Sequence, residues 1–321
     1  MSAPFLRCVI PGLLATALFL SGPGAVTINT GTTYQTLEGI GGAASMPGLY
    51  QKAGVFFVDR PLSYEYDRLC IDMGATALRF LMGSEGSYIA RGTYDWSAVQ
   101  GMISVMKECI ARGSDQFLIS ILNPPGWAKS NGIITNGGSL LDAEYDGFAE
   151  YAAQLCKVVK EATGVDPYAL SMQNEPLFPE PYGSCVYTDA NLSRLTSMAK
   201  AKLTAPGLTT HMVGPEDVFS NQGLNWPTMR DNPDVHGYAG HHDPNWSTAL
   251  NYIAGKNKQL WMTESDIFPS EWTAGLQPND YMTVGSRIIN ALNGGVTWWM
   301  WFSYNNNFGA GVAGTDGVDT M

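Results

Sequence analysis

Three consecutive segments of the sequence decide the fold. They read TALRFLMG at Thr76–Gly83, WSAVQGMISVMKECIAR at Trp96–Arg112 and QFLISILN at Gln116–Asn123. The first and third are short apolar runs of the kind that form buried strands, and the segment between them has apolar residues at helical spacing. A strand, a helix and a second strand in this order predict two parallel strands joined by a right-handed crossover.

The same strand-and-helix unit recurs along the chain. Eight strands in roughly 280 residues are typical of a closed (β/α)8 barrel, or TIM barrel, whereas an open doubly wound sheet usually has fewer. We therefore expect an α/β protein with a (β/α)8 barrel. Further helices are expected at 142–162, 190–203 and 280–292. The expected strands are Thr36–Ser45, Thr76–Gly83, Gln116–Asn123, Tyr168–Asn174, Thr209–Gly214, Val235–His241, Gln259–Glu264 and Val296–Ser303.

The composition is that of a globular protein with a large core. The chain has 321 residues, of which 45% are apolar and 15% are charged, and this excludes a disordered or coiled-coil protein. Its formal net charge is -11, which disfavours nucleic acid and anionic membranes as partners. The 12 Phe, 9 Trp and 15 Tyr residues suit a neutral polar ligand that stacks on aromatic rings.

The N-terminus predicts export. Arg7 precedes an apolar run at Val9–Leu20, and small residues follow up to Ala25, which is the outline of a signal peptide over residues 1–25. The run is shorter than the roughly 20 residues that span a bilayer, so we expect a secreted, monomeric protein without membrane contact after signal removal. Residues 26–35, VTINTGTTYQ, alternate like a strand outside the barrel, and residues 36–321 are expected to form the barrel.

Cysteine usage leaves two interpretations open. Removal of the signal peptide takes away Cys8 and leaves Cys70, Cys109, Cys156 and Cys185. Four cysteines in an exported protein allow two disulfides, in any of three connectivities, or four separate buried thiols. The sequence has no CxxC or HxxxH pattern, so we expect no metal site and no cofactor.

Two glutamates stand at the ends of expected strands. The fourth strand runs into SMQNEP at Ser171–Pro176, which contains Glu175, and the seventh runs into WMTES at Trp261–Ser265, which contains Glu264. Catalytic side chains of such barrels project from the C-terminal ends of the strands, so both carboxyl groups should lie at one mouth. Glycoside cleavage uses two carboxyl groups, one protonated to donate to the leaving oxygen and one ionised to attack the anomeric carbon. The pair therefore predicts a glycosidase.

Five segments strengthen this prediction. They are TYQTLEGIGGAAS at 33–45, ALRFLMGS at 77–84, NPPGWAKSNG at 123–132, LSMQNEPLFPEPYGSCVYT at 170–188 and WMTES at 261–265. Together they resemble glycoside hydrolase family 30, whose members are retaining enzymes built on (β/α)8 barrels. The segments occur in order on the expected strands and span most of the chain after residue 25. The resemblance implies cleavage of β-glycosidic bonds by double displacement through a glycosyl-enzyme intermediate.

The resemblance also implies roles for individual residues. Glu175 matches the family's general acid/base, and Glu264 matches its nucleophile. Asn174 matches the asparagine that hydrogen-bonds the sugar 2-hydroxyl, and Arg79 matches the arginine that keeps the nucleophile ionised. Further substrate-binding residues implied by the resemblance are Trp127 as an aromatic wall, Trp298 or Trp299 as a floor, and His241 on the sixth strand.

Several positions depart from the family pattern. Met46 replaces an aspartate of glucosylceramidase-like members, which disfavours an exo-acting glucosidase, and Asp243 replaces an aromatic residue that usually supports the nucleophile. Trp301 and Phe302 stand where the glucuronoxylan-cleaving branch has an arginine pair, so we expect a neutral, cell-wall type polysaccharide. Family members also carry a side β-sandwich completed by a C-terminal tail. That tail is absent, so we expect a truncated chain in which residues 26–35 are one strand of an incomplete sandwich.

Three alternatives are open at this point. Gly39–Ala44 satisfies the dinucleotide-binding pattern G-x-G-x-x-A, with Asp59 about 20 residues further on, although Ser45–Gly48 should break the helix that such a motif opens. A non-catalytic glycan-binding barrel would keep the aromatic residues and could lose either glutamate. An exo-acting β-glycosidase, such as a glucosylceramidase-like enzyme, would cleave the same class of bond.

Overall fold

The fold is described from a computed structural model. The described residues are 31–45, 66–205, 207–218, 225–242, 245–265 and 278–302. The expected signal peptide and residues 26–30 of the expected side strand lie outside these ranges, and residues 31–35 carry no strand. Secretion, the side strand and the truncation therefore stay predictions. Within the described ranges, no helix combines the length and apolar character needed to cross a membrane.

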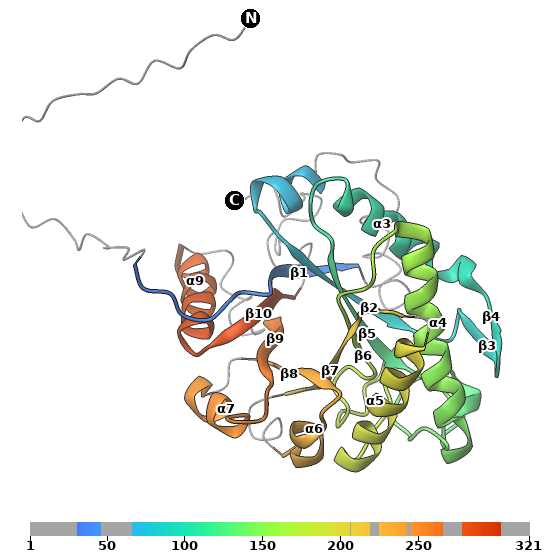
Figure 1. The fold of residues 1–321 in the computed structure, drawn as a ribbon. Helices are drawn as coiled ribbons and strands as arrows, with labels where there is room; N and C mark the ends of the chain where they lie inside the picture. Colours follow the sequence, from blue (N-terminus) through green and yellow to red (C-terminus); the bar gives the residue numbers. More distant parts are fainter. Residues whose placement is uncertain are drawn as a thin grey trace, which may run out of the picture. The chain divides into compact units, whose positions relative to one another are not determined.

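Eight parallel strands close into a barrel (Figure 1). The order around the barrel is β1, β10, β9, β8, β7, β6, β5 and β2, so the first strand pairs with the last. This confirms the (β/α)8 TIM-barrel prediction. The strands are β1 (Gly39–Ser45), β2 (Ala77–Gly83), β5 (Gln116–Asn123), β6 (Ala169–Ser171), β7 (His211–Val218), β8 (Val235–His241), β9 (Gln259–Ser265) and β10 (Val296–Trp301).

Helices surround the barrel (Figure 1), and their apolar faces pack on the outward side chains of the strands. In α4, Phe148, Ala152, Leu155 and Val159 recur at helical spacing and are all buried. The four long helices match the sequence prediction to within a few residues, whereas the short α6 and α7 were not predicted. The helices are α3 (Gln100–Ile110), α4 (Tyr145–Thr163), α5 (Asp189–Thr204), α6 (Pro227–Asp231), α7 (Trp246–Tyr252) and α9 (Pro278–Asn293).

A small hairpin follows β2 and was also not predicted. Its strands, β3 (Tyr88–Ala90) and β4 (Thr93–Tyr94), pair antiparallel. Gly92 between them has a φ of 72°, which glycine adopts without steric cost. Strands of three and two residues are too short to show an alternation of apolar and polar residues, so the sequence pattern does not reveal them.

The glycine-rich segment at the start of the barrel is a strand. Gly39–Ala44 lies within β1 and pairs with β2 and β10. The segment is therefore not the phosphate-binding turn that the dinucleotide-binding alternative requires, and that alternative is wrong. A Cβ on Gly39 would lie 2.6 Å from the Trp298 ring, and a Cβ on Gly237 would lie 2.6 Å from the Trp261 ring. The missing side chains make room for two tryptophans inside the barrel.

These two tryptophans form an aromatic layer in the N-terminal half of the barrel interior. Trp261 on β9 and Trp298 on β10 stack with their ring centroids 4.6 Å apart, and Tyr168 stacks on Trp298 at 5.1 Å. Small and medium side chains from the other strands complete the layer. Large rings beside small neighbours fill the tapered space of a small barrel.

Glu38, which directly precedes β1, binds this aromatic layer. One carboxylate oxygen accepts hydrogen bonds from Trp261 Nε1 at 2.7 Å and from the Thr297 hydroxyl at 2.8 Å. The other oxygen accepts from the Tyr168 hydroxyl at 3.1 Å and lies 2.5 Å from His236 Nε2. Burial raises the pKa of Glu38, but the hydrogen bonds, above all that with His236, outweigh burial and lower the pKa to about 2.

The four cysteines are buried thiols. Cys70 lies in the π-helix Arg68–Asp72, and Cys109 lies in α3. Of the two interpretations that the sequence left open, the structure has the separate thiols.

Replacing Glu38 by Gln should destabilise the barrel in a pH-dependent way. The pKa of Glu38 is lowered on folding from 4.5 to about 2, so its stabilisation is complete above pH 4.5 and is lost as the pH falls toward 2. The shift corresponds to about 3 kcal/mol. In urea unfolding, the difference in unfolding free energy between wild type and Glu38→Gln should be near about 3 kcal/mol at pH 7 and less than half of that at pH 3.

The matched control is Glu161→Gln, which changes an exposed carboxylate on α4 and should leave the unfolding free energy within about 0.5 kcal/mol of wild type at both pH values. An effect of Glu38→Gln that does not vary with pH would contradict the electrostatic explanation.

Candidate active site

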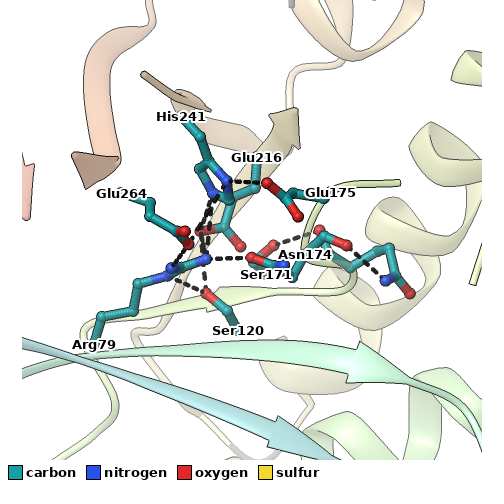
Figure 2. A network of polar contacts seen from close by, with 9 residues as sticks. Arg79, Ser120, Ser171, Asn174, Glu175, Glu216, His241 and Glu264 are labelled. Atoms are coloured by element: carbon teal, nitrogen blue, oxygen red, sulfur yellow. Dashed lines mark hydrogen bonds and ion pairs between the residues drawn. The ribbon is translucent and has the colours of Figure 1, made fainter. Parts of the chain in front are cut away.

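The C-terminal half of the barrel interior is polar. Side chains alternate between the two faces of a strand, so the residue two positions beyond the aromatic layer also faces inward. On β2, β5, β6 and β8 this residue is polar. Arg79 follows Ala77, Ser120 follows Leu118, Ser171 follows Ala169, and His241 follows Ala239. Together with side chains at the ends of β6, β7 and β9 they form one connected network (Figure 2).

Arg79 is the centre of this network and is fully buried. Burial lowers its pKa, but Glu216 and Glu264 raise it above its ordinary value, so the guanidinium stays charged. A buried ion loses several kcal/mol of hydration, which its partners must compensate. The guanidinium donates to Glu264 at 2.6 Å, Glu216 at 3.0 Å, the Asn174 side-chain oxygen at 2.6 Å and the Ser120 hydroxyl at 3.0 Å (Figure 2).

Glu264 reaches the network through an irregularity at the end of β9. Regular alternation would turn Glu264 outward like Met262, which packs in the core outside the barrel. The pairing of β9 with β8 skips one residue here: Gly240 pairs with Met262, and His241 pairs with Glu264. A β-bulge of this kind re-aims a side chain. The Glu264 side chain is 15% exposed and is therefore accessible from the barrel mouth.

Glu175 follows β6 and faces Glu264. Its φ of 44° lies in the left-handed region, which costs roughly 1 to 2 kcal/mol for a residue with a side chain. One carboxyl oxygen lies 3.2 Å from His241 Nδ1. Ligand atoms of Glu175, His241 and Glu264 lie within 4.8 Å of one another. The structure therefore brings together the two glutamates that the sequence singled out.

His241 lies among the carboxylates and is fully buried. Its Nδ1 is 3.7 Å from Glu264, and its Nε2 is 4.0 Å from Glu216. Burial lowers the pKa of His241, but the surrounding carboxylates, Glu264 first, raise it to about 9. A protonated imidazole has no lone pair to offer a metal ion, and Arg79 adds a second cation, so the Glu175–His241–Glu264 set is unsuited to a divalent cation.

Glu216 on β7 completes the network, and sequence reasoning missed it. Its carboxylate is fully buried and accepts from Arg79 at 3.0 Å and from the Ser120 hydroxyl at 3.1 Å. Burial raises its pKa, but Arg79 and then His241 outweigh burial and lower the pKa to about 2. Regular alternation would point Glu216 outward like Met212. A shift of register after Pro215 and a φ of 55° turn it inward.

The available signal for Glu216 was composition alone. Glu216 and Asp217 are two acids in succession inside an otherwise apolar segment, and buried acids are rare unless they are paired. The position of a bulge, which decides the direction of Glu216, is not encoded in any alternation of the sequence.

Trp127 is an exposed residue on the C-terminal side of β5. It lies in the short 3-10 helix Gly126–Ala128 directly after β5, and its ring packs edge-on against Tyr88 at 5.1 Å. With 42% of its surface exposed, the ring has a free area for stacking.

The predictions for Trp298 and Trp299 as a substrate-binding floor are wrong. Both residues are buried. Trp298 faces inward but lies in the aromatic layer, and Trp299 faces outward, where it stacks with Trp301 at 5.8 Å. Alternation along β10 instead assigns the inward position nearest the mouth to Phe302, which packs against the pair Leu81 and Leu122.

Two glutamates face each other at the C-terminal ends of the strands of a (β/α)8 barrel. This end of the barrel is where the active sites of enzymes with this fold lie. No protein-family model and no curated protein matches the sequence. Among solved structures, the chain is similar to the glycoside hydrolase family 30 subfamily 8 xylanase Xyn30A from Clostridium acetobutylicum, with 24% identity, a TM-score of 0.67, and coverage of 87% of this chain and 67% of that one.

Two further structures show the same likeness. The catalytic domain of GH30 xylanase C from Talaromyces cellulolyticus has 18% identity and a TM-score of 0.66, with coverage of 86% of this chain and 70% of that one. The endo-β1,6-glucanase BT3312 has 17% identity and a TM-score of 0.71, with coverage of 88% and 70%. The chain thus spans about two thirds of the length of these structures. They confirm the fold that the five sequence segments indicated.

Replacing Glu216 by Gln should lower the unfolding free energy by about 3 kcal/mol, because breaking a buried ion pair leaves Arg79 with an uncompensated charge. Urea unfolding at pH 7 measures the change. The matched variant Glu264→Gln removes the other Arg79 partner, whose side chain is partly exposed, and should cost less than half as much. Equal losses of unfolding free energy in the two variants would show that the deeper burial of Glu216 does not add to the stability of its ion pair.

Proposed function

We propose that the protein is a retaining glycoside hydrolase that cleaves β-glycosidic bonds in a neutral polysaccharide. The observation that carries this proposal is the pair Glu175 and Glu264 at the barrel mouth, with carboxyl oxygens within 4.8 Å and different electrostatic partners. Paired carboxyl groups in unlike environments are what glycoside cleavage requires. The xylanases and the endo-β1,6-glucanase that share the fold support the same reaction class.

The separation of the carboxyl groups supports retention. In retaining enzymes the two groups lie about 5 to 5.5 Å apart, whereas inverting enzymes need about 6.5 to 9.5 Å to accommodate a water molecule. One oxygen of Glu175 and one of Glu264 lie within 4.8 Å of each other, a close approach that favours the retaining range.

We assign the nucleophile role to Glu264 and the acid/base role to Glu175, as the sequence resemblance implies. Glu264 accepts a charge-assisted hydrogen bond from the Arg79 guanidinium at 2.6 Å, which orients its carboxylate for the role of nucleophile. In the first step, a Glu264 oxygen forms a bond to the anomeric carbon while the glycosidic bond breaks, and Glu175 donates a proton to the leaving oxygen. In the second step, Glu175 takes a proton from water, whose oxygen displaces Glu264.

We assign Asn174 to substrate binding. Its side-chain oxygen accepts from Arg79 at 2.6 Å, which fixes the amide and directs its NH2 group away from the guanidinium. We assign this donor to the sugar 2-hydroxyl, where a hydrogen bond strengthens in the transition state. The same Arg79 side chain therefore holds both the nucleophile and the 2-hydroxyl donor in place.

The substrate class follows from the charge and the aromatic surface. The formal net charge of -11 repels an acidic glycan at long range, and the exposed Trp127 ring suits the apolar face of a neutral sugar. The N-terminal segment over residues 1–25 supports action outside the cell, and we propose that the enzyme works as a monomer without a cofactor.

Glu264→Ala should abolish turnover of every β-glycoside, whereas Glu175→Ala should still form the glycosyl-enzyme with an aryl glycoside whose leaving group needs no protonation. Stopped-flow measurement of phenol release separates the two variants, and proton NMR of the first-formed sugar reports retention for the wild type. An inverted product, or equal losses of phenol release in the two variants, would contradict the assignment.

Among neutral β-glycans (xylan, β-1,6-glucan, β-1,6-galactan and β-1,4-glucan), at least one should be hydrolysed by the wild type and not by Glu264→Ala. Glucuronate side groups should not raise kcat/KM, because Phe302 offers no cationic anchor for a carboxylate. A strong preference for glucuronoxylan over xylan without uronates would overturn the neutral-substrate proposal. Binding of a glycan without hydrolysis would favour the non-catalytic alternative.

A further inference from the structure

Among the described aromatic rings, only Tyr88 packs against the exposed ring of Trp127. The two rings meet edge-on, with centroids 5.1 Å apart and planes at 66°, which is a favourable geometry for an aromatic pair. Trp127 is 42% exposed, and an exposed side chain samples several rotamers unless a contact selects one of them. Tyr88 is therefore the ring that can select one orientation of Trp127.

The helix α4 holds the Tyr88 ring in place. The ring is fully buried, stacks on Tyr151 with centroids 4.9 Å apart and planes at 10°, and lies 6.4 Å from the Phe148 ring. The Tyr151 hydroxyl is hydrogen-bonded to Ser87 Oγ at 2.6 Å, directly before Tyr88 in the chain. Tyr88 thus connects a long helix of the barrel wall with an exposed ring after β5.

The hairpin of β3 and β4, which lies beside α4 (Figure 1), also contacts the Tyr88 ring. Tyr88 is the first residue of β3, and Tyr94 on β4 packs against it with centroids 5.6 Å apart. The Tyr88 backbone N–H donates to the Ser84 carbonyl oxygen at 2.8 Å. Both the side chain and the backbone of Tyr88 are therefore fixed, in contrast to the exposed ring of Trp127.

The space for the Tyr88 ring comes from a glycine inside α4. A Cβ on Gly147 would lie 2.6 Å from the Tyr88 hydroxyl oxygen, so a larger residue there would displace the ring. Glycine in a helix is unfavourable relative to alanine, and here it makes room for Tyr88. Within the described ranges, the buried Tyr88 hydroxyl has no hydrogen-bond partner. The ring, and not the hydroxyl group, is therefore what the surroundings of Tyr88 accommodate.

We propose that Tyr88 is a positioning residue, which holds the Trp127 ring in one orientation for stacking on a sugar ring of the substrate. This proposal rests on the proposed function. Trp127 follows β5, whose neighbours in the barrel are β2, which carries Arg79, and β6, which Glu175 follows. The ligand of the exposed indole face is a neutral pyranose, whose C–H groups pack on an aromatic ring.

An orientation that is fixed before binding strengthens the complex. A side chain that is ordered only when the ligand arrives loses rotamer freedom, and this loss weakens binding by about three- to tenfold. Tyr88 removes this loss for Trp127, because the ring contact exists in the free protein. The effect belongs to binding and not to the chemical step, since the stacked sugar is bound in the substrate complex and in the transition state alike.

The first test is a steady-state comparison on whichever of the four neutral glycans the wild type hydrolyses. Tyr88→Leu should raise KM by about three- to tenfold and keep kcat within about twofold of wild type. Tyr88→Phe retains the ring and should keep the wild-type KM. An unchanged KM in Tyr88→Leu, or a loss confined to kcat, would overturn the positioning role and leave the proposed function intact.

Phe117→Leu is the matched control for structural damage. Phe117 is fully buried and packs edge-on against Phe80 with centroids 5.8 Å apart, but it lies in the core outside the barrel. The substitution removes the same kind of ring, so the urea midpoint should fall as it does in Tyr88→Leu, while KM stays at the wild-type value. An equal rise of KM in both variants would show that lost stability alone weakens binding, and would overturn the proposal.

The double variant tests whether Tyr88 acts through Trp127. In a Trp127→Ala background there is no ring to orient, so Tyr88→Leu should change KM by less than about twofold. A further rise as large as that in the wild-type background would mean that Tyr88 affects substrate binding by another route, which contradicts the proposal.

A readout without catalysis covers failure of the proposed function. If the wild type hydrolyses none of the glycans, the glycosidase proposal fails, and ¹⁹F NMR of protein labelled with 5-fluorotryptophan still tests the orientation of Trp127. The Trp127 signal is identified by its loss in Trp127→Phe. It should move toward the shift of free 5-fluorotryptophan in Tyr88→Leu and keep its position in Tyr88→Phe and Phe117→Leu. A Trp127 signal that does not move in Tyr88→Leu overturns the proposal.

Discussion

The buried guanidinium of Arg79 is the interaction on which the site depends. A cation without water must be matched by acceptors with good geometry, or it destabilises the fold. Here the acceptors come from β5, from the end of β6, from β7 and from β9. One side chain on β2 therefore fixes the relative positions of several strands, and the barrel register and the site geometry depend on each other.

The two halves of the barrel interior differ in character: the N-terminal half is packed with aromatic rings, and the C-terminal half holds the buried charges. The aromatic layer around Trp261 and Trp298 fills the N-terminal half with large rings, and it is polar only at its edge, where Glu38 binds it. Above it, Arg79, Glu216 and His241 are fully buried. Charges in such a setting interact more strongly than in water. Glu175 and Glu264 are partly exposed, by 13% and 15%, so the two candidate catalytic carboxyl groups lie between the buried charges and the barrel mouth.

The regular parts of the fold could be predicted from the sequence. Short apolar runs separated by helical periodicity gave all eight barrel strands, and the β5 and β8 boundaries agree with the structure to the residue. At β6 the predicted strand was too long: the chain leaves the ladder after Ser171, and the Asn174 amide instead donates to the Ile121 carbonyl oxygen. At β7 it was too short, because the bulge lets pairing continue to Val218.

The candidate site was predictable where it depends on strand ends and not where it depends on side-chain direction. Glu175 and Glu264 were found because they follow apolar runs, and Arg79 because it interrupts one. Glu216 was missed because a bulge reverses its direction. The resemblance assigned Trp298 or Trp299 to the floor, but it did not account for how deep each residue lies along β10. The inward position nearest the mouth belongs to Phe302.

The irregular backbone is concentrated where the chemistry is proposed. Glu175, Glu216 and His242 all have positive φ values, of 44°, 55° and 61°, and they follow β6, interrupt β7 and follow β8. Such conformations cost about 1 to 3 kcal/mol each and persist only when the surrounding structure determines them. The ion pairs of Arg79 and the packed aromatic layer supply that constraint. A regular barrel would point Glu216 and Glu264 toward the helices, so the departures from regular strands are what convert a stable scaffold into a site with converging carboxyl groups.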